Sequence, residues 1–125
     1  MALALLDTSI LVDILRKHRP ALTWYAAQTQ LGVSRVVWLE AIQGAWDKPS
    51  QERALRLLRT FELVELSTAD AEWATHQLVQ FNLSHNIDAF DCLIASASHR
   101  LQIPLYTQNL KHFTPLLGSL ARSPY

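Results

Sequence analysis

The sequence has few glycines and only one cysteine, and both shortages exclude particular kinds of site. Its three glycines, Gly32, Gly44 and Gly118, form neither G-x-G-x-x-G nor G-x-x-x-x-G-K-[ST], the two Gly-rich loops that cradle nucleotide phosphates. The single Cys92 excludes an internal disulfide and a cysteine-based zinc site. A lone cysteine also suits a reducing compartment.

Long apolar runs and a charge surplus are missing as well. No run approaches the roughly 20 apolar residues of a membrane-spanning helix, and no basic segment precedes the N-terminal apolar run as it would in a signal peptide. We therefore expect a cytoplasmic protein without a membrane partner. Eleven basic and eleven acidic residues give a net charge of zero, which argues neither for nor against a nucleic-acid partner. The densest basic group is residues 16–19.

What is present is a large share of apolar residues in alternating patterns. At 125 residues and 50% hydrophobic content, we expect a single globular domain covering residues 1–125. Apolar runs bounded by turn residues predict strands at about 3–6, 31–33, 63–66, 103–107 and 115–120. Helical spacing predicts helices at about 8–15, 20–26, 35–45, 51–61, 69–81, 87–100 and 110–113, with residues 82–86 as a polar loop. Strands that alternate with helices along the chain imply a mainly parallel sheet covered on both faces, an α/β fold.

Asp7 stands where the first predicted strand ends and a helix begins. In open α/β sheets, ligands bind at the carboxyl ends of the strands. Asp7 is therefore either a functional ligand or the cap of the helix that follows it. Acids at similar junctions further along the chain favour the first interpretation.

Two further acids fall on predicted helices. Glu40 lies on or beside the apolar face of its helix, where a Glu is uncommon unless it is paired, bound to a metal or leaning out to solvent. Asp88 and Asp91 are three residues apart near a helix N-terminus, where the helix dipole alone would favour them. Asn109 follows the predicted strand at 103–107, again at a strand exit.

Asp7, Glu40, Asp91 and Asn109 are then expected on one rim of one sheet. Carboxylates about 4 Å apart at an effective dielectric of about 20 repel by about 4 kcal/mol per pair, so such a cluster needs protons, cationic side chains or a metal. Oxygen donors without thiolates favour Mg²⁺ or Mn²⁺ over zinc. Pairing of the acids with Arg35 or Lys111 is the alternative that the sequence leaves open.

Four segments of the chain resemble motifs of a known family. They are Leu6-Asp7-Thr8-Ser9, residues 39–44 around Glu40, residues 91–97 beginning with Asp91, and residues 107–113 around Asn109. In this order and spacing the chain resembles the PIN-domain ribonucleases, and among them the VapC-like toxins of type II toxin–antitoxin pairs. The resemblance covers nearly the whole length. It implies a three-layer α/β/α sandwich with a central mainly parallel sheet.

The resemblance also implies an activity and a site. The activity is an Mg²⁺- or Mn²⁺-dependent endoribonuclease, a hydrolase that cuts RNA phosphodiester bonds, paired with a small antitoxin protein and assembled as a homodimer. Asp7, Glu40 and Asp91 match the three core acids of the family and would be both catalytic residues and metal ligands. Asn109 would be a fourth catalytic residue, at a position that is Asp in many members, and its lack of charge lowers the expected occupancy of a second metal. Ser9 and Thr107 would orient Asp7 or metal-bound water.

Two other functions remain as alternatives. A phosphatase of the haloacid-dehalogenase type would use Asp7 as nucleophile, but it needs a second Asp two residues later, where this chain has Ser9. A catalytically weak or inactive PIN-like module that binds protein or RNA would retain the fold alone.

The histidines, two of the tryptophans and the cysteine are interpreted as structural residues. No two of the five histidines have the H-x-x-x-H spacing of a zinc site, so we interpret each as a surface or satisfied core residue. Trp38 and Trp46, two helical turns apart, are predicted to pack in the core rather than to form an exposed pair. Cys92 is predicted to be a small buried residue.

Overall fold

The sheet is built from five strands, and every neighbouring pair of strands is parallel. The computed structural model describes residues 1–125. Its strands are β1 (Ala4–Leu6), β2 (Leu31–Ser34), β3 (Glu62–Val64), β4 (Leu105–Tyr106) and β5 (Ala121–Arg122). They lie in the order β3-β2-β1-β4-β5, so β1 is the central strand. The predicted parallel sheet is therefore confirmed.

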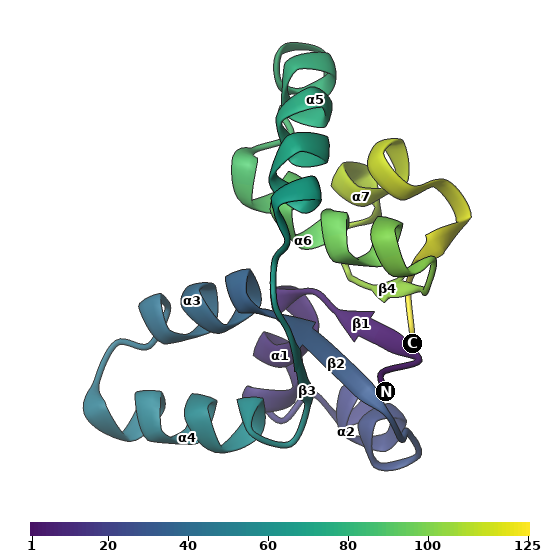
Figure 1. Ribbon diagram of the computed structural model, residues 1–125. Coiled ribbons are helices and arrows are strands. Elements are labelled where there is room, and N and C mark those ends of the chain that lie inside the picture. The colour runs from purple at the N-terminus through teal and green to yellow at the C-terminus, as the bar shows by residue number, and fades with distance from the viewer.

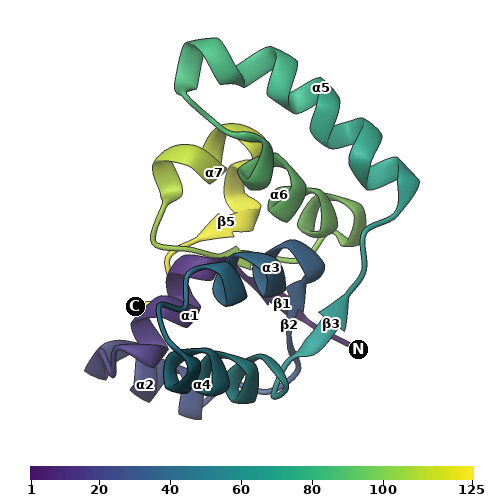
Figure 2. The same cartoon turned by 90° about the vertical axis from the view of Figure 1, so that its left-hand side faces the viewer.

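Helices cover both faces of this sheet. They are α1 (Thr8–Leu15), α2 (Arg19–Ala26), α3 (Arg35–Gln43), α4 (Lys48–Leu58), α5 (Thr68–His85), α6 (Ala89–Leu101) and α7 (Leu110–Leu117), with a short 3₁₀ helix at Gly118–Leu120. Helices α1, α2 and α4 lie below the sheet in Figures 1 and 2, and α5, α6 and α7 lie above it. Helix α3 contacts α1 and α4 as well as α6. The fold is thus the three-layer α/β/α sandwich that the resemblance implied.

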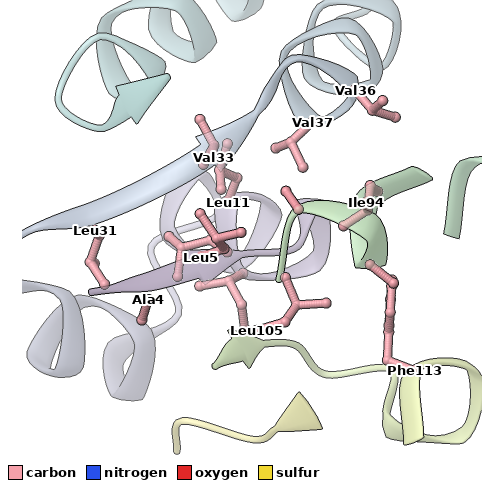
Figure 3. Close-up of a cluster of buried hydrophobic side chains, with 14 of the residues drawn as sticks. Ala4, Leu5, Leu11, Leu31, Val33, Val36, Val37, Ile94, Leu105 and Phe113 are labelled. Carbon is pink, nitrogen blue, oxygen red and sulfur yellow. The ribbon is translucent and has the colours of Figure 1, made fainter. Parts of the chain in front are cut away.

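The hydrophobic core lies where the central strands meet helices from both layers (Figure 3). The strand residues Leu5, Val33 and Leu105 are at most 1% exposed. Val37 of α3 and Phe113 of α7 are fully buried and belong to the same cluster. Because a parallel sheet is covered on both faces, its strands can be apolar at successive positions, and this is the pattern that made β1 and β2 predictable.

Side-chain caps fix the starts of several helices. Ser34 accepts from Val37 N–H at the start of α3. Ser67 and Asp70 form a reciprocal capping box at the start of α5. At the start of α4 the Asp47 carboxylate accepts the Ser50 N–H at 2.8 Å and caps the helix, which begins at Lys48.

Two boundaries differ from the prediction. The polar residues 82–86 do not form a loop after residue 81: helix α5 continues to His85 and ends at Asn86, which adopts a left-handed conformation with φ 55°. Residues 115–117 belong to helix α7 rather than to a strand. The apolar residues Phe113, Leu116 and Leu117 have helical spacing and are buried together, and their packing outweighs the presence of Pro115 inside the helix.

The strand register decides which side chains meet at the carboxyl edge of the sheet. Leu6 of β1 pairs with Tyr106 of β4, so the residues that follow these strands, Asp7 and Thr107, leave the sheet side by side. None of the helices is both long enough and apolar enough to cross a membrane.

Candidate active site

Asp7 is the centre of the site, and the carboxyl end of the central strand places it there. Its side chain is 6% exposed. Oδ1 accepts the Thr8 backbone N–H at 2.7 Å and so caps helix α1, while Oδ2 accepts hydroxyl donors from Ser9 and Thr107, each at 2.8 Å. Asp7 therefore caps a helix and is also held in a single orientation by the next strand exit.

The loop after β4 is joined to the loop after β1 by two hydrogen bonds from backbone amides. Asn109 N–H donates to Thr107 Oγ1 at 2.8 Å, and Gln108 N–H donates to Ser9 Oγ at 3.0 Å. Each hydroxyl thus accepts from the loop and donates to Asp7. The expectation that Ser9 and Thr107 would orient Asp7 agrees with these contacts.

Glu40 reaches the site from α3 and contacts the residue next to Asp7. Thr8 Oγ1 donates to Glu40 Oε1 at 2.6 Å. Burial raises the pKa of Glu40; the bond from Thr8 lowers it in part, and the negative charges of Asp7 and Asp88 raise it further. Glu40 lies in the middle of α3, which begins directly after Ser34.

Asp91 comes from the first turn of α6. Asp88 caps this helix by accepting the Asp91 backbone N–H at 2.8 Å, so Asp88 has a structural role here. Burial raises the pKa of Asp91 from 3.8 to about 6, and the charges of Asp88 and Asp7 add to the rise. The charge of Asp7 thus raises the pKa of both Glu40 and Asp91, although the three acids come from separate segments of the chain.

His112 is a site residue that the sequence interpretation missed. Its Nδ1 lies 2.9 Å from the Asn109 amide nitrogen and 3.1 Å from Asp91 Oδ2. In a neutral His112, the Nδ1 that accepts from the Asn109 amide nitrogen does not donate to Asp91, whereas the charge of a protonated His112 would lower the pKa of Asp91. Asp91 Oδ2 is buried without a hydrogen-bond partner. The signal that could have found His112 is its position three residues after Asn109 on α7.

The buried Oδ2 of Asp91, which has no hydrogen-bond partner, bears on whether the site suits a divalent cation. Such an oxygen is costly unless a proton or a cation satisfies it. The surrounding donors are carboxylate and amide oxygens, the ligands that Mg²⁺ prefers. No three Asp, Glu, His or Cys side chains are close enough to hold one ion together. The donor set therefore fits a Mg²⁺ that takes one or two carboxylates directly and keeps its waters for the rest.

The cationic residues considered as partners for these acids do not neutralise them. Arg35 binds Glu65 instead, through Nε at 2.9 Å and a second nitrogen at 2.6 Å. Lys111 forms no ion pair with any acid. Apart from His112, whose Nδ1 lies 3.1 Å from Asp91 Oδ2, no cationic side chain pairs with the acids of the site.

Two predictions about neighbouring residues have different outcomes. Cys92 is fully buried, as predicted, and burial raises the pKa of its thiol to about 11. Trp38 is half-buried against the core, but Trp46 is 82% exposed, so the prediction that both pack in the core was wrong for Trp46. Trp46 follows the end of α3 in the short connection to α4, beyond the reach of the core.

Comparisons with known proteins agree with this architecture. The family model described as PIN domain matches residues 4–113. Among solved structures, a toxin–antitoxin complex from Klebsiella pneumoniae has a chain 26% identical to this one, with a TM-score of 0.81 and 98% of each chain covered. The DNA-bound VapBC complex from Salmonella typhimurium has a chain 18% identical, with a TM-score of 0.79 and 100% of each chain covered.

A third similar structure is VapC20 from Mycobacterium tuberculosis, a toxin that cleaves the sarcin-ricin loop. It is 16% identical, with a TM-score of 0.68, and the match covers 83% of this chain and 88% of VapC20. No curated protein matches the sequence significantly.

Proposed function

The chain belongs to the PIN domain family, and from this premise we propose that it is a metal-dependent endoribonuclease, the toxin of a VapBC-type toxin–antitoxin pair. The family match, which extends over residues 4–113, supports a nuclease. The similarity to a chain of a toxin–antitoxin complex from Klebsiella pneumoniae, over 98% of both chains, supports the toxin role. VapC20, which cleaves the sarcin-ricin loop, supports RNA as the substrate.

The observation that carries the proposal is the unpartnered Oδ2 of Asp91 beside two other acids. A structural carboxylate would be expected to have a donor for each buried oxygen. Here the chain fully satisfies Oδ2 of Asp7 with two hydroxyls but leaves Oδ2 of Asp91 free. Raised pKa values of Asp91 and Glu40 at one rim of the sheet are typical of a functional site.

In this proposal Asp7, Glu40 and Asp91 would hold Mg²⁺ or Mn²⁺, directly or through water. When bound, the metal would lower the pKa of a water and balance charge on the phosphate oxygens of an in-line displacement. The chain's own residues hold the acids in place: Ser9 and Thr107 fix the Asp7 carboxylate, and Thr8 fixes that of Glu40.

Asn109 and His112 complete the proposed site without adding negative charge. The Asn109 amide is held by His112 Nδ1 on one side, and its own backbone N–H is held by Thr107. Its side-chain oxygen is then left to accept a hydrogen bond from water or from an RNA hydroxyl. Because Asn109 lacks the charge of Asp, the site favours one metal over two.

The partners in this proposal are a small antitoxin and a second copy of the chain, acting in the cytoplasm where RNA is found. The solved toxin–antitoxin complexes support the antitoxin. Support for a homodimer comes from apolar side chains that are exposed in the single chain: Val79 and Leu83, one turn apart on α5, are 81% and 96% exposed. Sedimentation of the wild type and of a Leu83→Lys variant would show whether this face pairs.

The experiment that tests the function is cleavage of a mixed RNA pool by the purified chain with Mg²⁺, Mn²⁺ or EDTA. The wild type should cleave only with metal, and Asp7→Asn should lose cleavage while it stays folded. Glu72→Gln is the matched control, because Glu72 is an exposed acid on α5 far from the site in sequence and should cleave like the wild type. A folded, antitoxin-free protein that cleaves nothing would instead favour an inactive PIN-like binding module.

A further inference from the structure

A cleft of about 390 Å³ opens beside the proposed site, between helices α1, α3 and α4. Thr8 and Glu40, which bind each other in the site, form part of its wall. Its floor is apolar and includes Leu11, Leu15 and Ala54. A ligand in this cleft would therefore lie next to any phosphate bound at Asp7 and Asp91.

The outer rim of the cleft carries an exposed aromatic ring and two arginines. Trp46 lines the cleft and is 82% exposed. Arg16 and Arg53 also line it, and neither forms an ion pair. Arg53 donates only to Ser50 Oγ, at 3.1 Å. Hydrogen bonds from Ser50, and then the charge of Arg53, lower the pKa of the exposed Asp47, but no carboxylate lies within ion-pair distance of either guanidinium group, so both remain available for a ligand.

The charge and chemistry of this rim favour one kind of occupant. Two unpaired arginines attract an anion, and a guanidinium binds phosphate in a bidentate way. An exposed indole stacks on bases of single-stranded nucleic acid without selecting a particular base. A cleft of this volume is in the range of small-ligand sites, in which apolar walls surround a few polar groups.

Resting on the proposed function, we infer that this cleft binds an unpaired RNA nucleotide next to the scissile phosphate. The base stacks on Trp46 against the apolar floor, and Arg16 and Arg53 bind the phosphates that flank it. The net charge of the chain is zero, so these local arginines supply the attraction for RNA that the overall composition does not. The acids Asp7, Glu40 and Asp91 mark where the RNA is cut, and the cleft holds the nucleotide that lies beside the cut.

Binding is measured by the fluorescence anisotropy of a short, end-labelled single-stranded RNA of mixed sequence in EDTA, where no metal-dependent cleavage consumes it. Trp46→Ala should weaken binding about tenfold, and Trp46→Phe should restore most of it. Arg53→Gln and Arg16→Gln should each weaken binding and reduce the slope of log Kd against log salt by about 0.7. Arg56→Gln is the matched control, because Arg56 is exposed on α4 but does not line the cleft.

An abasic RNA separates stacking from general attraction. If Trp46 stacks on a base, Trp46→Ala should weaken binding of the intact RNA but hardly change binding of an RNA whose nucleotides lack bases. Equal losses for both RNAs would overturn the stacking role. Trp46, Arg16 and Arg53 are exposed, so their substitution should leave thermal unfolding unchanged.

The outcomes distinguish this inference from the proposed function. In one outcome, cleavage depends on Asp7, but both cleavage and RNA binding are unchanged in the cleft variants. That outcome would overturn the inference about the cleft and leave the proposed nuclease function intact. Loss of binding in those variants without any cleavage supports the cleft and contradicts the nuclease. If the cleft variants bind RNA as the wild type does but bind the antitoxin more weakly, the cleft belongs to the protein partner and the inference is overturned. A wild type that binds no RNA would also overturn the inference.

Discussion

The Thr107 hydroxyl donates to Asp7 Oδ2 at 2.8 Å across one hundred residues of sequence. Thr107 is fully buried, and the same hydroxyl oxygen accepts the Asn109 backbone N–H. The exit of β4 is therefore joined to the exit of β1 through one side chain. This bond holds the central acid and the Asn109 loop in a fixed relation before any ligand arrives.

Replacing Thr107 by Val keeps the shape of the side chain but removes both of these bonds. A buried carboxylate oxygen and a backbone N–H each lose a partner, so we expect a loss of about 1 to 3 kcal/mol in the free energy of unfolding. Thr107→Ser should lose less because it keeps the hydroxyl. Urea unfolding measures both, with Thr75→Val on the exposed face of α5 as the control. A Thr107→Val protein as stable as the wild type would contradict the role.

The ion pair between Asp70 and Arg100 is predicted to stabilise the fold without affecting the site. Asp70 is 2% exposed, and Arg100 Nε lies 3.0 Å from its Oδ1. Removing Arg100 with Arg100→Met leaves a buried charge whose only remaining donor is the Ser67 backbone N–H, so we expect a loss of about 3 kcal/mol. The double variant with Asp70→Asn should regain part of this loss. Thermal unfolding of the four proteins of this cycle measures the coupling, and additive losses would show that the two groups do not interact.

The fold was largely predictable because its signals are local. Val33 and Leu5 lie in short apolar runs that only a sheet covered on both faces can bury. The errors arose where tertiary packing outweighs local signals. Helix α5 continues through a polar stretch because Asn82 donates from within the helix to the Ile87 carbonyl at 3.0 Å and closes the following turn.

The site was predictable only in part, because its acids stand at recognisable junctions but their partners do not. Asp7 and Asp91 could be chosen from strand ends and family motifs. His112 could not be chosen by a search for paired histidines, because its partners in the structure are Asn109 and Asp91. Trp46 was misassigned because helical spacing was extended past the end of α3.

Asn109→Asp is predicted to strengthen metal binding and to lower the stability of the metal-free protein. The new carboxylate cannot donate to His112 Nδ1, and it adds a fourth negative charge close to Asp91. We expect Mn²⁺ to bind several-fold more tightly, measured by titration calorimetry, while the unfolding temperature in EDTA falls. Gln108→Glu adds the same charge one residue earlier on an exposed side chain and serves as the matched control. Equal Mn²⁺ affinities for wild type and Asn109→Asp would place Asn109 outside the metal site.

Asp91→Asn is predicted to stabilise the metal-free protein while it abolishes cleavage. Burial raises the pKa of Asp91 from 3.8 to about 6, so between these values the folded chain binds more protons than the unfolded chain. The stability that the protonated form provides is fully present below about pH 4 and is lost as the pH rises through about 6. Asn carries no charge to lose, so the stability of the variant does not depend on this titration.

The variant should therefore be more stable than the wild type by about 1 to 3 kcal/mol at about pH 7.5 in EDTA, at 1.36 kcal/mol per pKa unit, and the difference should vanish near pH 4. Urea unfolding across this pH range measures the difference. Saturating Mg²⁺ should stabilise the wild type and leave Asp91→Asn nearly unchanged, because only the wild type retains the carboxylate that the metal needs. A variant less stable than the wild type at pH 7.5 in EDTA would mean that the Asp91 charge is satisfied within the fold, and a site that is already satisfied has no need of a cation.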